Sequence, residues 1–143
     1  MVGKLFVRRR DARVEVRVSD EGRQLLRDIF VRVVAAERDP DHEWHAPLNG
    51  PITPSSDDDD PLATLKRQSD IASNAELSFM SVNEQFLNDG EAWAWLATLQ
   101  VALRSTALAH GVLSDERLAT CEGSVLDEIH TLQRLLYDLA NCF

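Results

Sequence analysis

The chain of 143 residues contains 44% hydrophobic and 27% charged residues, proportions typical of a globular protein. This length suits one hydrophobic core, so we expect residues 1–143 to form a single domain. No apolar run follows the basic segment Lys4–Arg10, and polar side chains interrupt the most apolar stretch, Ala92–Ala109. We therefore expect no signal peptide, no membrane span and a cytoplasmic protein.

Charge is divided unevenly along the chain, whose formal net charge is −9. Residues 1–38 carry ten Lys and Arg against six Asp and Glu, a balance of +4. Residues 39–143 carry five against eighteen, a balance of −13. Because complementary charges orient protein contacts, we expect the basic N-terminal segment to lie against an acidic face, in its own chain or in a second copy.

Residues 1–18 are predicted to form a β-hairpin. Valines alternate with charged residues in Arg13–Val18, which predicts a strand with one buried face. Lys4–Arg8 is expected to be the other strand, with a turn at Arg9–Ala12. A lone hairpin is only marginally stable in water, so its valine face must pack on helices or pair across a dimer.

Residues 19–38 are predicted to form a first helix that begins after a Ser19 cap. Its buried stripe is expected to contain Leu25, Ile29 and Val33, widened by Leu26, Phe30 and Val34. Residues 39–60 are predicted to form a Pro- and Asp-rich loop, because four prolines prevent a long helix. A loop of this length is typical of a functional or a partly disordered segment, and Asp57–Asp60 favours disorder.

Residues 61–143 are predicted to form a helical body. Helix is expected to restart at Asp60–Pro61, with breaks near Ser69 and at Ser81–Asn83. The longest buried helix is expected at Asn88–His110, with Asn88 and Glu91 at its start and Gly111 as its stop signal.

Two tryptophans of this central helix, Trp93 and Trp95, are about 200° apart around its axis. One of them can anchor the core, and the other must meet a second layer, a partner or solvent. The last helix is expected to begin at Ser114 and to include both cysteines, Cys121 and Cys142, as buried thiols. Its seam against the central helix is predicted to contain Val125, Ile129, Leu132, Leu136, Leu139 and Phe143.

Several features follow one another in a fixed order over nearly the whole chain. They are a basic strand pair, Asp60–Leu62, Glu91–Ala92, Trp95–Leu96 with Leu99, and a Leu-rich final helix. This order resembles a bacterial domain of unknown function that is common in actinobacteria and carries the family number two thousand and seventeen. The resemblance implies no known activity. Genes of that family often neighbour the gene for an adaptor of the Clp protease, and some members carry a transcription-regulator label. The resemblance alone therefore points to an unidentified protein partner.

No motif predicts a chemical reaction. His42 and His45 lie beside carboxylates, but a metal site needs three or four ligands in fixed geometry. Asp57–Asp60 lacks the spaced oxygen ligands and the glycine of a calcium loop. No nucleophile elbow and no phosphate-binding glycine cluster occurs. We therefore predict no catalytic, cofactor-binding or metal-binding residue, and not an enzyme.

The predicted fold is mainly α, a small bundle of four to five helices with an N-terminal β-hairpin. We expect a non-enzymatic interaction or regulatory protein that forms a homodimer. One alternative is a DNA-binding transcriptional regulator that uses the basic hairpin, although the acidic body should repel nucleic acid. Another is an enzyme with a carboxylate or histidine site near His42 and His45. The residues predicted to make interactions are Arg8, Arg9, Arg13, Arg17, Trp93 and Trp95.

Overall fold

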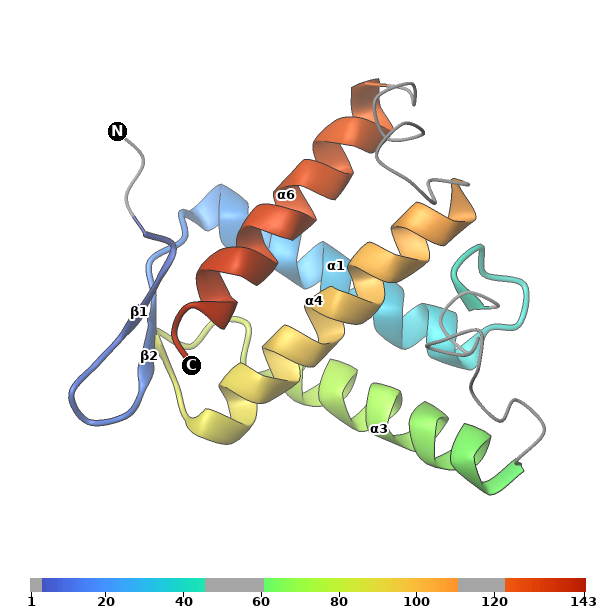
Figure 1. Cartoon of the computed structure of the whole chain (residues 1–143), viewed down its shortest axis with the longest axis horizontal. Helices are drawn as coiled ribbons and strands as arrows, with labels where there is room; N and C mark the ends of the chain where they lie inside the picture. Colours follow the sequence, from blue (N-terminus) through green and yellow to red (C-terminus); the bar gives the residue numbers. More distant parts are fainter. Residues whose placement is uncertain (1–3, 46–60, 111–122) are drawn as a thin grey trace.

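The computed structural model describes residues 4–45, 61–110 and 123–143, and within these the backbone of residues 61–68 without its side chains. Four helices and a small antiparallel sheet make up these parts, which confirms the predicted fold class (Figure 1). The elements in chain order are β1 (Phe6–Arg8), β2 (Val14–Val16), α1 (Asp20–Arg38), α3 (Pro61–Met80), β3 (Phe86–Leu87), α4 (Asp89–Ala109) and α6 (Gly123–Ala140).

The sheet has three strands in the order β1-β2-β3, so the predicted hairpin gains an unpredicted third strand. Phe6 pairs with Val16 across β1 and β2, and Val14 pairs with Leu87 across β2 and β3. These four side chains are buried, so the valine face packs within its own chain. Strand β3 was missed because two residues are too few to show an alternating pattern.

The turn between β1 and β2 lies where the sequence predicts it, at Arg9–Ala12. The Arg9 N–H donates to the Arg13 carbonyl at 2.8 Å, and the Ala12 N–H donates to the Arg9 carbonyl at 3.1 Å. Ala12 has a φ of 70°, in the left-handed region that residues with a Cβ rarely adopt. The strand pairing therefore holds one turn residue in a conformation that an isolated chain would disfavour.

Helix α1 begins as predicted, because the Gly22 N–H donates to the Ser19 hydroxyl at 3.1 Å. Its inward face is centred on Leu26, Phe30 and Val33, all fully buried. Leu25 was predicted to be buried but is exposed, since it precedes Leu26 by one residue and so lies about 100° away around the helix. The face of α1 that packs against the core is therefore slightly rotated from the face that the sequence predicted.

Helix α3 runs unbroken from Pro61 to Met80, so the predicted break near Ser69 is wrong and the break after Met80 is confirmed. No glycine or proline lies between these two ends to interrupt the backbone hydrogen bonds. Residues 39–45, the described part of the segment that follows α1, also differ from a purely solvated loop. Trp44 is fully buried in the core, with the Arg32 guanidinium 3.9 Å from the centre of its ring.

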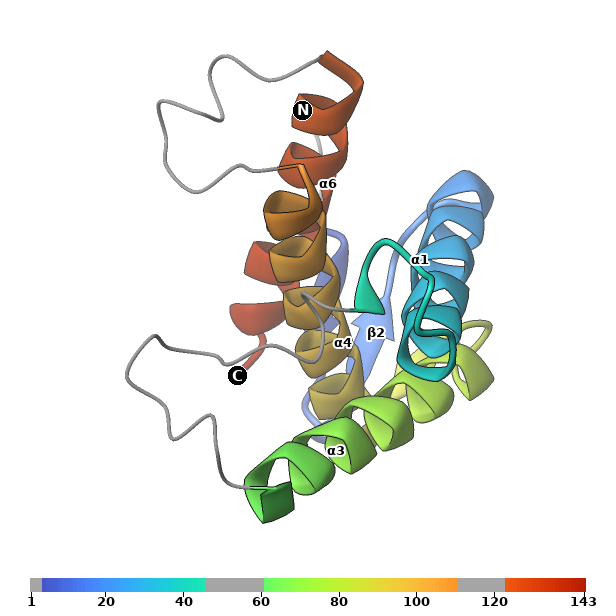
Figure 2. The ribbon, with the colours of Figure 1, turned by 90° about the vertical axis from the view of Figure 1, so that its right-hand side faces the viewer.

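Helix α4 is the central helix, as predicted, and it contacts α1, α3 and α6. Figure 2 shows α1 on one side of it and α6 on the other, with α3 crossing one end of the bundle. Asn88 and Glu91 form the predicted capping box: the Glu91 N–H donates to Asn88 at 2.8 Å and the Asn88 N–H donates to Glu91 at 2.9 Å. This capping box therefore determines where α4, the longest described helix, begins.

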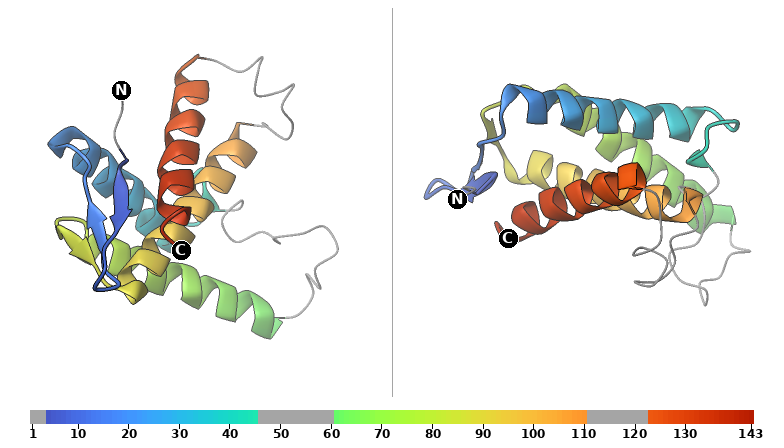
Figure 3. Two further views of the ribbon diagram at one scale, coloured as in Figure 1. Left: turned by 60° about the vertical axis from the view of Figure 1, so that its left-hand side comes forward. Right: turned by 90° about the horizontal axis from the view of Figure 1, so that it is seen from above.

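Helix α6 lies antiparallel beside α4, and its C-terminal end contacts β1 (Figure 3). Most of the predicted seam is buried, but Leu135 is more deeply buried than Leu136. The helix ends at Ala140, so Cys142 and Phe143 lie beyond it and both are partly exposed. The predictions for Asp57–Asp60, Gly111, Ser114 and Cys121 fall outside the described residues. Among the described helices, none has the length and apolar character that crossing a membrane requires.

Candidate interaction surface

Three elements that are distant in sequence meet at one corner of the molecule: the end of β1, the start of α4 and the end of α6 (Figures 1 and 3). Arg8, the last residue of β1, reaches Asp89, the first residue of α4, with 2.9 Å between Nη1 and Oδ1. Both side chains are partly exposed, so solvent screens this ion pair. The contact fixes the hairpin next to the first turn of α4.

Trp93 follows Asp89 by one helical turn, so the two side chains share one ridge of α4. Its ring stacks on Phe143, with 4.4 Å between ring centres and 36° between ring planes. Trp93 is 56% exposed and Phe143 is 46% exposed. Phe143 is positioned by the turn after α6, where its N–H donates to the Ala140 carbonyl at 3.1 Å. Two large aromatic rings therefore lie together at the surface.

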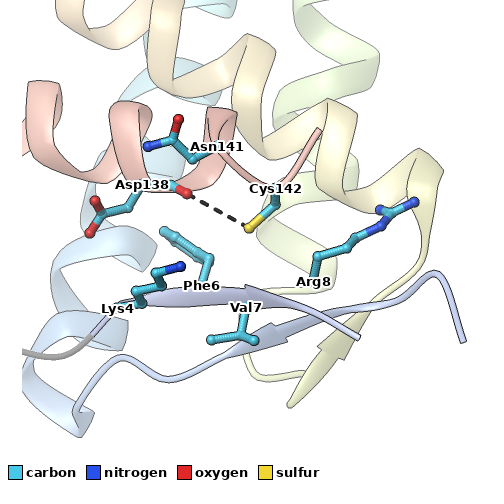
Figure 4. Close-up of a pocket in the computed structure, with 7 residues that line it drawn as sticks. All are labelled: Lys4, Phe6, Val7, Arg8, Asp138, Asn141 and Cys142. Atoms are coloured by element: carbon cyan, nitrogen blue, oxygen red, sulfur yellow. Dashed lines mark hydrogen bonds between the residues drawn. The ribbon is translucent and has the colours of Figure 1, made fainter. Parts of the chain in front are cut away.

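A hollow of about 460 Å³ lies between β1 and the end of α6 (Figure 4). Burial raises the pKa of the Cys142 thiol, while the positive charges of Arg8 and Lys4 oppose that rise. The thiol is thus mainly protonated at neutral pH, and a protonated thiol is a weak nucleophile. The residues that line the hollow are Lys4, Phe6, Val7, Arg8, Asp138, Asn141 and Cys142.

We define the corner surface as Arg8, Asp89, Trp93 and Phe143. Its composition combines a guanidinium and two aromatic rings, the side chains enriched at the centres of protein interfaces. The adjoining hollow contributes one thiol and one carboxylate, and no histidine is among its described lining residues. The exposed aromatic rings beside an ion pair are suited to contact with another surface.

Two of the other predicted arginines, Arg13 and Arg17, pair with carboxylates inside the hairpin, and the third, Arg9, is exposed at its turn. Arg13 pairs with Asp11, with Nη2 and Oδ2 2.6 Å apart, and its hydrogen bond lowers the pKa of that carboxyl group. The Arg13 guanidinium also lies 4.4 Å from the centre of the Phe86 ring. Arg17 pairs with Glu15. Within the described ranges, Arg8 is thus the hairpin arginine that is paired with a carboxylate of the helical body.

Trp95 is fully buried, which places it in the core and outside the corner surface. Its Nε1 donates to the Ser81 hydroxyl at 2.8 Å, and its ring meets Phe6 and Phe30 edge-on, at centre-to-centre distances of 6.2 and 5.2 Å. The structure therefore separates the two tryptophans as helical periodicity predicts. Trp95 anchors three elements of the core, and Trp93 is left for a partner or for solvent.

Among the described residues, His42 and His45 do not converge with carboxylates into a metal site. The Trp44 N–H donates to His42 Nδ1 at 3.1 Å, and His45 Nδ1 lies 2.7 Å from the Ala36 carbonyl oxygen. Over the part of the chain that the structure describes, no group of three His, Cys, Asp or Glu could hold a metal ion. These histidines therefore shape the turn that carries Trp44 into the core.

Sequence reasoning missed Asp89 and Phe143 as surface residues. Asp89 was given no role in the sequence-based prediction, although its spacing of four from Trp93 could have linked the two. Phe143 follows Leu139 by four residues and was therefore assigned to the buried seam. Phe143 lies outside the seam because α6 ends at Ala140, three residues before it.

Comparison of the chain with models of known protein families, with curated proteins and with solved structures gives no match.

Proposed function

We propose that the protein is a non-enzymatic interaction protein with a regulatory role, and that it forms a homodimer through the corner surface. The observation that carries this proposal is the exposed Trp93–Phe143 stack next to the Arg8–Asp89 ion pair. Tryptophan and arginine are the residues that most often dominate binding energy at protein interfaces.

The aromatic pair offers enough area to drive a weak association. A fully covered Trp or Phe buries roughly 150–250 Å², and these two rings are each about half exposed, so they leave roughly 200 Å² to be covered in each copy. At about 25 cal/mol per Å², two copies gain about 10 kcal/mol. This gain is comparable with the ~4–15 kcal/mol cost of association. We therefore expect a dimer whose population depends on protein concentration.

A second copy is the partner that this chain itself supports best. Two-fold symmetry would place the same aromatic pair on both sides of the contact, because such an interface is self-complementary. The charge division favours the same arrangement, since each copy offers a basic N-terminal segment and an acidic remainder. The resemblance to the actinobacterial family stays a prediction, and no residue of this proposal is taken from it.

Sedimentation velocity over a series of protein concentrations tests the proposal. Wild-type protein should shift from monomer to dimer, and Trp93→Ala and Phe143→Ala should each stay monomeric over the range where wild type dimerises. Phe79→Ala is the matched control, because it removes an exposed aromatic ring on α3, outside the corner surface. Trp44 and Trp95 are buried, so tryptophan emission should move to shorter wavelength on dimerisation as Trp93 becomes covered.

Two results would contradict this proposal. One is a wild-type protein that is monomeric at the highest concentration that stays in solution. The other is a dimer that Trp93→Ala and Phe79→Ala weaken equally, because association would then involve another face.

A DNA-binding regulator remains the second candidate, because Arg8, Arg9, Arg10, Arg13 and Arg17 are all exposed. Three of these arginines already face carboxylates, and the net charge of −9 opposes the approach of phosphate. A gel shift with random duplex DNA at physiological salt should show no complex. A complex that weakens steeply with added salt would favour this candidate over the homodimer.

A further inference from the structure

Two adjacent arginines in the hairpin turn, Arg9 and Arg10, differ from the rest. Among the arginines whose side chains the structure describes, each of the others has a side-chain hydrogen bond, an ion pair, a ring contact or another interaction, and the side chains of these two have none. Both are exposed and both lie at the tip of the hairpin. Their charge is therefore available to a group outside the chain.

The turn holds this tip in place. Backbone hydrogen bonds join Arg9 to Arg13 and Ala12 to Arg9, and Ala12 occupies the left-handed region. Asp11 accepts from both the backbone N–H and the guanidinium of Arg13, at 3.1 and 2.7 Å. Because Asp11 is engaged with Arg13, it is only partly available to neutralise its neighbours.

The tip also borders an open hollow. Arg8, Arg9, Arg10 and Asp11 line a hollow of about 450 Å³. Arg8 forms one wall, and its bond to Asp89 fixes that wall relative to α4. The guanidinium groups of this hollow can each donate two parallel hydrogen bonds to a carboxylate. A ligand that reaches it therefore meets several donors within one hairpin turn.

We propose that the hairpin tip binds an acidic segment of a partner protein, in which consecutive Asp or Glu carboxylates pair with the free guanidinium groups of Arg9 and Arg10. This site goes beyond the dimer contact, because Arg9 and Arg10 are not part of the corner surface. Arginine suits the role, since its planar fork matches the geometry of a carboxylate.

An acidic polypeptide fits this tip better than nucleic acid does. Duplex DNA carries a charge about every 1.7 Å and would extend past three arginines over a body whose balance is −13. A short run of carboxylates needs only the tip and can then turn away from the acidic body. Charge complementarity therefore favours a compact acidic segment.

Fluorescence anisotropy with a labelled hexa-aspartate peptide and the full chain tests this inference. The double variant R9Q/R10Q should bind about tenfold more weakly, because each exposed ion pair contributes up to about fivefold. The matched control R27Q/R134Q removes the same charge from a half-buried site on α1 and an exposed site on α6, both outside the hairpin, and should bind within about twofold of wild type. A hexa-asparagine peptide should not bind. Added salt should weaken the wild-type complex.

Three outcomes would overturn the inference: no saturable binding of hexa-aspartate to wild type, an equal loss in both double variants, or tighter binding of a duplex DNA of equal charge. The last would assign the tip to nucleic acid. Trp93→Ala separates the two proposals, because it should abolish the dimer and leave peptide binding unchanged.

Discussion

The hydrogen bond between Trp95 and Ser81 joins α4 to the turn after α3, and its contribution to the free energy of unfolding can be measured. Nε1 of Trp95 donates to the Ser81 hydroxyl at 2.8 Å, and that hydroxyl donates to the Leu77 carbonyl at 2.7 Å. Both residues are buried. Ser81→Ala removes the acceptor and leaves a buried indole N–H without a partner, which should cost about 1–3 kcal/mol of unfolding free energy.

A double-mutant cycle isolates this bond from the packing of the ring. Trp95→Phe alone should cost more than Ser81→Ala, because the indole also packs edge-on against Phe6 and Phe30. In the Ser81→Ala background, Trp95→Phe also removes the unpaired donor, so its additional cost should be smaller by about 1–2 kcal/mol. Urea unfolding of the four proteins at one fixed concentration measures this coupling, and the fixed concentration keeps any dimer contribution equal.

The matched control uses the other tryptophan of the same helix. Trp93 is exposed and stacks on Phe143, whereas Ser81 is buried and bonded to Trp95, so Ser81→Ala and Trp93→Phe should be additive within about 0.5 kcal/mol. If the Trp95 cycle is also additive to that extent, the hydrogen bond does not contribute to stability and the reasoning is refuted.

Three further predictions concern single sites. Asn88→Ala should lower the free energy of unfolding by about 1 kcal/mol, because it removes the α4 cap; an unchanged thermal midpoint would contradict this. Leu132→Ala should lower the free energy of unfolding by ~2–5 kcal/mol, and Leu136→Ala should lower it less because Leu136 is partly exposed. Equal losses of unfolding free energy in denaturant would contradict the observation that Leu132 is the more deeply buried of the two. Alkylation of Cys142, followed by peptide mass mapping, should rise at higher pH in folded than in urea-unfolded protein, because burial raises the pKa of the folded thiol and only the thiolate reacts. Coincident pH profiles would show that this burial has no effect.

Local signals in the sequence predicted the helix starts well. Ser19 and Asn88 cap α1 and α4 in the structure because their side-chain oxygens satisfy nearby backbone N–H groups, a short-range interaction that needs no tertiary contact. The hairpin turn at Arg9–Ala12 was predicted on similarly local grounds. Such elements follow from neighbours within a few residues, so the sequence displays them directly.

Positions whose burial depends on other elements were predicted less well. Leu25 and Phe143 fit a helical stripe by spacing, yet both are exposed. Leu25 is exposed because the neighbouring elements cover an adjacent face of α1. Phe143 is exposed because α6 ends at Ala140, three residues before it. Trp44 lies in a segment predicted to be a loop, yet it is buried under the Arg32 guanidinium. Periodicity identifies a face of one helix, but the partner helix determines which edge of that face is covered.

For this protein, the sequence alone determined the helical class, the hairpin, the caps and the opposite directions of Trp93 and Trp95, because these depend on local hydrogen bonds and helical periodicity. Only the tertiary structure decided that Trp95 enters the core and that Trp93 stacks on Phe143 beside Arg8 and Asp89. Arg8, the first turn of α4 and Phe143 are far apart in the chain, and they meet because the sheet and the ends of two helices pack at one corner. Burial of apolar area across the whole core drives that packing, so no single stretch of the sequence displays it.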